Sequence, residues 1–250
     1  MIILREANHV ITMARREIRQ RWPLLGVAAA LGLMPVVASA FWPEVRADGR
    51  TLGIAEFFVA QAIAAFVGLG LVGDDLASGR MGWYFSLPLS GLAIWAGKLG
   101  GAGVLAVAAT FLMVLPTLFL AQPLAEELYV PLDAAGFVLI PLMFLCAGVV
   151  GGIVARGRTR WLFLDLAGVL ALPLVIMPTS EAIHASRHDL HGVDAAILLA
   201  FIVSFLVASA AGVIVGRADA RRAHAAASVT MWGIMVPAQL ALFAYVRFGS

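Results

Sequence analysis

Long apolar runs without charged residues, separated by short polar segments, dominate the chain from residue 22 onward. A membrane-spanning helix needs about 20 apolar residues, since each residue adds about 1.5 Å across a hydrocarbon core of about 30 Å. The pattern predicts about seven spans and an all-α, polytopic integral membrane helix bundle. Two spans continue past an acidic residue, so that the second starts near Leu52 and the fifth at Trp161. The uncharged runs are Trp22–Pro43, Phe57–Gly73, Leu99–Ala125, Ala134–Ala155, Leu166–Ser180, Ala195–Gly216 and Ala225–Val246.

Residues 1–21 carry a different pattern, in which apolar positions recur every three or four residues and arginines fall mostly between them. This periodicity predicts an amphipathic helix with a basic face, suited to lying at the inner surface of a membrane. Pro23 then marks the turn into the first span. The apolar positions of this helix are Ile3, Ala7, Val10, Ile11, Ala14 and Ile18.

Composition supports a membrane protein and excludes several other classes. Hydrophobic residues make up 62% of the 250 residues and charged residues 13%, whereas about a quarter of a soluble domain is charged. The mean hydropathy is +0.97. These values exclude a disordered chain, a nucleic-acid-binding protein and a disulfide scaffold. The single cysteine, Cys146, leaves no partner for an intrachain disulfide.

The placement of the basic residues predicts the orientation. With a cytoplasmic N-terminus and seven alternating spans, all but four of the 17 Lys and Arg residues fall on the cytoplasmic side, as the positive-inside rule expects. We therefore expect a multi-pass protein of the bacterial inner membrane whose C-terminus lies outside. A six-span alternative makes the last run re-entrant or interfacial. The four basic residues on the outer side are Arg46, Arg50, Arg187 and Arg247.

The sequence lacks the motifs of common enzymes. The stretch from Gly91 to Lys98 resembles a phosphate-binding loop, but five residues separate its glycines and Leu99 replaces the required Ser or Thr. HExxH, GxSxG and CxxC motifs are also missing. We therefore expect no catalytic residue and no nucleotide site in this chain. Asp165, near the inner end of the fifth span, is expected to pair with Arg158 or Arg160.

Three histidines in an outer loop are the only candidate metal ligands. His184, His188 and His191 follow one another at steps of four and three residues, so on a helix they would share one face. Neutral imidazoles placed in this way could bind zinc or copper. The alternative is a solvated loop whose histidines bind nothing.

The longest inner connection, residues 74–98, combines charged residues with the aromatic run of Trp83, Tyr84 and Phe85. An exposed aromatic patch of this kind suits docking to a soluble partner. With the preceding basic helix and two spans, the segment resembles the ABC-2 family of ABC-transporter permeases. The matching pieces are Asp75, Gly79, Ser86-Leu87-Pro88 and Gly97-Lys98.

The resemblance implies a permease subunit of an ATP-driven exporter. In that family, the inner loop forms a coupling helix that docks in a groove of a separate ATPase subunit, which binds the ATP and Mg. It further implies two ATPase subunits, a second permease protomer in a homo- or heterodimer, and six spans with a cytoplasmic C-terminus, so residues 225–246 would be an added span. The expected ATPase-coupling residues are Asp74, Asp75, Arg80, Trp83 and Tyr84, with Arg156, Arg158 and Arg160 as a second inner contact.

The chain is thus expected to form a single transmembrane domain over residues 1–250, with membrane lipids as further partners and without nucleic acid. Two alternatives remain open. One is a permease of the same fold for metal-cofactor or metalloenzyme maturation, which would use the three outer histidines. The other is a membrane scaffold or assembly protein that transports nothing.

Overall fold

The computed structural model describes residues 2–42, 49–87, 89–118, 134–157, 159–170, 190–217 and 219–248, and all regular structure in these ranges is helical. Residues 162–170 form one helical segment. The other helices are α1 (Ile2–Arg21), α2 (Pro23–Phe41), α4 (Gly49–Ala77), α5 (Arg80–Ser86), α6 (Gly91–Leu118), α7 (Ala134–Gly157), α9 (Leu190–Gly216) and α10 (Ala220–Phe248).

Six of the described helices are long and apolar enough to cross a membrane, namely α2, α4, α6, α7, α9 and α10. A helix can enter lipid because its backbone amide and carbonyl groups form hydrogen bonds within the helix itself. The prediction of a multi-pass helical membrane protein is therefore confirmed. Of the fifth predicted span, only residues up to 170 are described, and these are helical from residue 162. The later part of that span lies outside the described residues.

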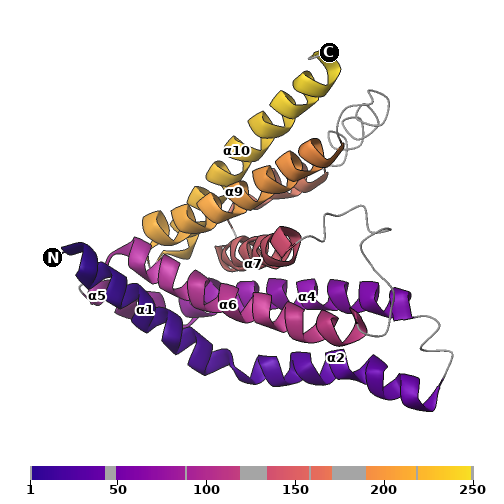
Figure 1. Ribbon diagram of the computed structural model, residues 1–250. Helices are drawn as coiled ribbons and strands as arrows, with labels where there is room; N and C mark the ends of the chain where they lie inside the picture. The colour runs from indigo at the N-terminus through magenta and orange to yellow at the C-terminus, as the bar shows by residue number, and fades with distance from the viewer. Residues whose placement is uncertain are drawn as a thin grey trace.

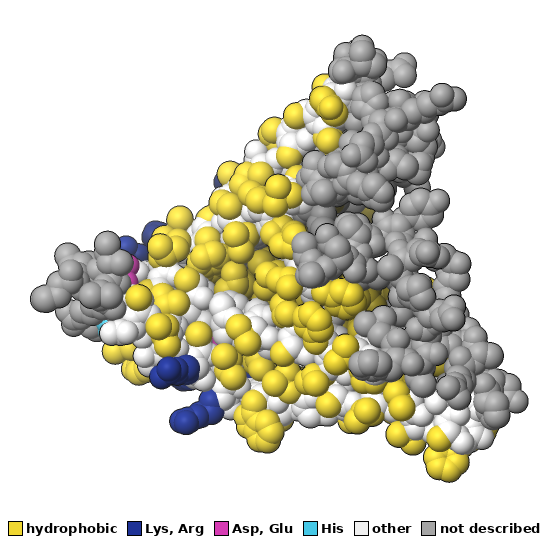
Figure 2. Space-filling view, in the orientation of Figure 1, with side chains coloured by type: hydrophobic (Ala, Val, Ile, Leu, Met, Phe, Trp, Pro, Cys, Tyr) yellow, Lys and Arg dark blue, Asp and Glu magenta, His cyan; other side chains and the backbone are white. Residues whose placement is uncertain are grey.

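The helices converge at one end of the molecule and diverge towards the other (Figure 1). Helices α1 and α5 lie at the converging end, together with the junction between α9 and α10. We call this the basic end, because the helix termini that meet there carry or adjoin Arg80, Arg156 and Arg217. Figure 2 shows Lys and Arg side chains at this end, while hydrophobic side chains cover much of the remaining described surface in that view.

Small residues bring α4 and α7 into close contact at the centre of the bundle. A Cβ atom at Gly148 would collide with the carbonyl oxygen of Ala65, and one at Gly152 would collide with that of Leu69. Two glycines one turn apart thus let the backbones approach. This contact joins the helices that carry Asp74 and Arg156.

Helix α1 packs lengthwise on the first half of α6. Met13 and Glu17 are buried, and Gly97 and Gly101 of α6 leave room for the α1 backbone, since a Cβ atom at Gly101 would lie 2.6 Å from the carbonyl oxygen of Ala14. Residues 2–21 are helical, as the period of the sequence predicts, and the location of this helix at the inner membrane surface stays a prediction. Its buried side lies against protein, which leaves the arginine-bearing side to face outward.

Candidate functional site

The segment predicted as an inner connection, residues 74–98, is helical for most of its length. Its first residues complete α4, its last residues begin α6, and α5 lies between them. The chain turns sharply before α5 at Gly79, whose φ of +72° is a left-handed conformation that favours glycine. Ser90 caps the start of α6, because its Oγ accepts a hydrogen bond of 3.1 Å from the Ala93 amide. These local signals fix α5 as a separate short helix.

A buried ionic cluster centred on Lys98 lies directly behind α5. The Lys98 ammonium is 2.8 Å from Glu17 Oε1 and 2.7 Å from Asp75 Oδ2, and it donates a further hydrogen bond to the Leu71 carbonyl at 3.2 Å. The Lys98 and Glu17 side chains are 3% exposed and Asp75 is 8% exposed. One ammonium thus joins helices α1, α4 and α6.

Two further arginines contact the carboxylates of this cluster at its edge. Arg21 Nε lies 3.4 Å from Glu17 Oε2, and Arg80 Nε lies 3.8 Å from Asp75 Oδ1. Each carboxylate therefore faces both the shared ammonium and a guanidinium of its own. Buried charges are tolerated when they are paired in this way, and removing one partner is costly because it leaves an uncompensated buried charge. The cluster fixes the position of α5 relative to three long helices.

Helix α5 has a buried face and an outward face, and each carries an aromatic side chain. Tyr84 is 2% exposed, and its ring lies 5.3 Å from Lys98 Nζ and 5.5 Å from the guanidinium carbon of Arg16. Trp83 is 55% exposed, although Arg16 also approaches its ring, at 6.0 Å. Tyr84 therefore anchors α5, whereas Trp83 and the half-exposed Arg80 form a surface that a partner could contact.

The two predicted groups of inner residues meet through one surface ion pair. Arg156, at the end of α7, contacts Asp74 of α4 at 3.1 Å, and both side chains are about half exposed. Arg160 is exposed in the turn that follows α7. Arg158 lies outside the described residues. The structure thus brings Arg156 next to the residues of the 74–98 segment and leaves Arg160 on the surface.

Sequence reasoning missed three members of this site, Glu17, Lys98 and Arg16. Glu17 follows Val10 and Ala14 on the apolar side of the predicted helix, and an acid in that position signals a buried cationic partner. Lys98 is the only lysine of the chain, and it entered the sequence interpretation as part of a rejected phosphate-binding loop and of the Gly97-Lys98 match, without a carboxylate partner. These two observations together could have pointed to the pair.

A second buried polar cluster surrounds Asp165, and it corrects the expected pairing with Arg158 or Arg160. Asp165 Oδ2 accepts hydrogen bonds from His224 Nε2 at 2.8 Å and from Ser228 Oγ at 2.9 Å, while Oδ1 accepts one from Trp232 Nε1 at 2.8 Å. All three donors come from α10, because residues 162–170 pack alongside that helix. The carboxylate is therefore satisfied across helices, and of the two expected partners the described one, Arg160, is exposed at the surface.

The His224 ring is fully buried, and both its nitrogens have partners. Its Nδ1 lies 2.9 Å from Thr159 Oγ1 and 3.4 Å from the Thr159 amide nitrogen, which can only donate. Nδ1 is therefore assigned as the acceptor, and Nε2 carries the hydrogen that is donated to Asp165. This arrangement ties the turn after α7 to the first turns of α10.

The candidate metal ligands are not brought together in the described part of the chain. His184 and His188 lie outside the described residues, and His191 is in α9 at a position whose side chain is not described. Across the described ranges, no group of three His, Cys, Asp or Glu side chains could hold a metal ion. Metal binding by the three histidines stays a prediction.

Comparison with known proteins gives no relative. No protein-family model matches the chain, and no curated protein or solved structure matches it. The functional interpretation therefore depends on the geometry of the basic end and on the physical chemistry of its residues.

Proposed function

We propose that this chain is the transmembrane permease subunit of an ATP-driven exporter of the ABC-2 type, coupled through α5 to a separate ATPase subunit. One observation carries the proposal: α5 is anchored from behind by the Lys98 cluster and presents Trp83 and Arg80 outward. An aromatic side chain beside an arginine, on a rigid support, is typical of a protein docking site.

The orientation of the basic end supports this assignment. Lys and Arg residues gather there (Figure 2), and the positive-inside rule places such an end in the cytoplasm, where an ATPase and its ATP are found. Helix α4 has 29 residues and is therefore about 43 Å long, about 13 Å more than the hydrocarbon core. We infer that its last turns project into the cytoplasm of a bacterial inner membrane and carry α5 with them.

We further infer seven crossings. Helices α7 and α9 both end at the basic end, since Gly157 adjoins Ala220 and Gly216 adjoins Ala223. The chain thus leaves α7 at the basic end and begins α9 at the opposite end, which is the basis for inferring a further crossing. The helical segment at residues 162–170 supports this route, because Asp165 lies beside His224 and Gly168 lies beside Trp232, further along α10.

Seven crossings predict that the two chain ends lie on opposite sides of the membrane. A reporter that is active only in the cytoplasm, fused after Ser250, should be inactive, while the same reporter before α1 should be active. A periplasmic reporter is the control and should give the reverse pattern. Cytoplasmic activity at both ends would instead support six crossings, with the last helix not traversing the bilayer.

The cluster also suggests how ATP hydrolysis in the partner would move the spans. Because Lys98 joins α1, α4 and α6, displacement of α5 by a closing ATPase would be transmitted to these helices as a rigid-body tilt. Two permease protomers and two ATPase subunits would form the complete exporter, with ATP and Mg held by the ATPases. We expect the substrate path to run between the protomers and to be lined by apolar residues, which favours a lipid-like, peptide or amphipathic substrate.

The docking assignment predicts that Trp83→Ala weakens ATPase association by about tenfold or more, as the loss of a central aromatic contact does at other interfaces. The measurement is the amount of ATPase that co-purifies with the tagged chain from host membranes. Trp42→Ala is the matched control, because Trp42 is similarly exposed but lies at the end of α2 away from the basic end.

Trp42→Ala should leave ATPase association unchanged. Transport by the purified chain alone in liposomes, without ATP or another protein, would refute the proposed function. Equal co-purification of the ATPase with the Trp83→Ala and wild-type chains would refute the docking role of α5 alone.

A further inference from the structure

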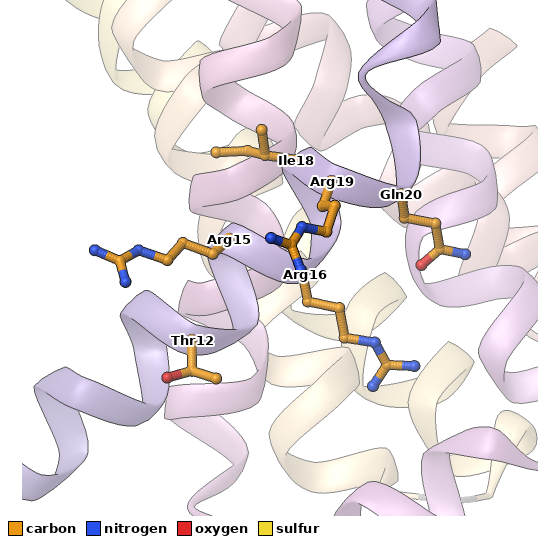
Figure 3. Close-up of a pocket in the computed structure, with 6 residues that line it drawn as sticks. All are labelled: Thr12, Arg15, Arg16, Ile18, Arg19 and Gln20. Atoms are coloured by element: carbon orange, nitrogen blue, oxygen red, sulfur yellow. The ribbon is translucent and has the colours of Figure 1, made fainter.

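The outward face of α1 forms an open, basic pocket that the proposed coupling role does not use. Its volume is about 850 Å³. Figure 3 shows the side chains of Arg15 and Arg16 extending in opposite directions, with Arg19 between them. The described residues that line the pocket are Thr12, Arg15, Arg16, Ile18, Arg19 and Gln20.

None of the three arginines has an acidic partner within the described ranges, although Arg16 is engaged by the rings of α5. Glu17 lies between Arg15 and Arg19 in sequence, but its carboxylate is turned inward to Lys98 and Arg21. Arg16 lies over the aromatic rings of α5. The pocket therefore holds two guanidinium groups, one helical turn apart, whose donors are directed to the outside. Such a pair is suited to an oxyanion, because guanidinium groups bind phosphate with paired hydrogen bonds.

The position of the pocket along the chain identifies the source of the anion. Three residues, 20 to 22, separate Arg19 from Pro23, the first residue of the apolar helix α2, so Arg19 lies about 6 Å before the start of the span along the helix axis. Trp22 is 61% exposed at this junction, as expected of an aromatic residue at a membrane interface. With α2 entering the membrane at Pro23, we expect the guanidinium groups to lie near the depth of the lipid phosphates.

Apolar surface next to the arginines favours a lipid over an acidic protein. Ile11 and Trp22 are exposed on α1 and at its end, and the exposed side chains of α2 continue this surface from Val27 onward. A ligand that covers both parts needs an anionic head and an apolar tail. An anionic phospholipid has both, whereas the acidic surface of a soluble protein would leave the apolar part uncovered.

We propose that the outward face of α1 binds the phosphate of an anionic phospholipid, such as phosphatidylglycerol or cardiolipin, through Arg15 and Arg19. The amide of Gln20 can donate a further hydrogen bond. Lipid binding at this site requires only that α2 enters the membrane. A test of this binding is therefore independent of the proposed ATPase partner. Because Arg16 lines the same pocket and contacts Trp83 and Tyr84, the bound headgroup lies next to the support of α5.

The experiment compares lipid binding by the full-length chain and by two charge-matched double variants. Purified protein is titrated with phosphatidylglycerol or phosphatidylcholine, and bound lipid is counted by native mass spectrometry and by the shift in thermal unfolding. Arg15→Gln/Arg19→Gln removes the proposed ligands. Arg221→Gln/Arg222→Gln is the control, because it removes the same charge from exposed positions of α10 at the same end.

We expect saturable, phosphatidylglycerol-selective binding that weakens about 30-fold in Arg15→Gln/Arg19→Gln, on the basis of about 1 kcal/mol for each arginine near an anionic surface. The α10 variant should bind like wild type. Equal losses in the two variants, or no preference over phosphatidylcholine, would overturn the site. If inorganic phosphate displaced all bound phosphatidylglycerol, the site would be assigned to free phosphate instead of a lipid. If Arg15→Gln/Arg19→Gln lost co-purifying ATPase but kept its lipid, the site would be assigned to the ATPase.

Discussion

Replacing Lys98 with methionine is expected to lower the free energy of unfolding by about 3–5 kcal/mol, the usual cost of breaking a buried ion pair from one side. The reason is that Glu17 and Asp75 are both buried and share the Lys98 ammonium, so the variant leaves two carboxylates without their common partner. Methionine keeps an unbranched chain of similar length and removes the ammonium with its charge and its hydrogen-bond donors. Equilibrium unfolding in detergent micelles measures the effect.

A matched control distinguishes the effect of removing a buried positive charge from the effect of removing any positive charge at this end. Arg156→Met removes one positive charge from the Asp74–Arg156 pair, which is about half exposed at the same end. Exposed pairs contribute about 0–1 kcal/mol, so this variant should unfold almost like wild type. Comparable losses in the two variants would mean that the Lys98 cluster does not hold the helices together.

Neutralising the whole cluster provides a second test of the same explanation. In Glu17→Gln/Asp75→Asn/Lys98→Met, both buried carboxylates that lost the shared ammonium are replaced by neutral amides, so most of the stability lost in Lys98→Met should return. If α5 transmits motion through the ionic contacts, this variant should still reduce ATP-driven transport. A triple variant that is stable but transports poorly would support a coupling role of the cluster. A triple variant that recovers both stability and transport would indicate a purely structural role.

The membrane helices could be predicted from sequence because a long uncharged run has few alternatives in lipid. The pattern of apolar runs anticipated the six described helices that can span a membrane, and the period of residues 1–21 anticipated α1. Turn and capping residues also have effects that depend on near neighbours in sequence. Gly79 makes the turn before α5 through its left-handed conformation, and Ser90 caps the start of α6 through its side chain. Local signals of this kind can be interpreted without knowledge of the tertiary contacts.

The polar clusters could not be predicted in the same way, because their members are distant in sequence. Glu17 and Lys98 are 81 positions apart, and Asp165 and His224 are 59 apart. For Asp165, the arginines a few residues away were the more obvious partners, yet helix packing placed α10 beside it and left Arg160 at the surface. Which charged residues pair depends on how each helix is rotated about its axis and on which helices pack together. Neither can be derived from the periodicity of apolar residues within one helix.

The Asp165 cluster leads to the second large expected effect. Asp165→Ala should lower the free energy of unfolding by about 3 kcal/mol or more, because His224, Ser228 and Trp232 all donate to this carboxylate. Each buried donor left without an acceptor costs about 1–3 kcal/mol. Asp165→Asn should lose less, since its amide oxygen can still accept. Equilibrium unfolding in micelles measures all variants.

The location of the damage distinguishes this role from general destabilisation. Hydrogen exchange should increase in residues 162–170 and in the first turns of α10, while the α4–α7 contact stays protected. Ser204→Ala is the control: Ser204 is equally buried, but its hydroxyl donates only to the Ala200 carbonyl of its own helix, so its loss should cost less than about 1 kcal/mol. If Asp165→Ala behaved like Ser204→Ala, the carboxylate would not be what attaches residues 162–170 to α10, and the route inferred for the fifth crossing would lose its main support.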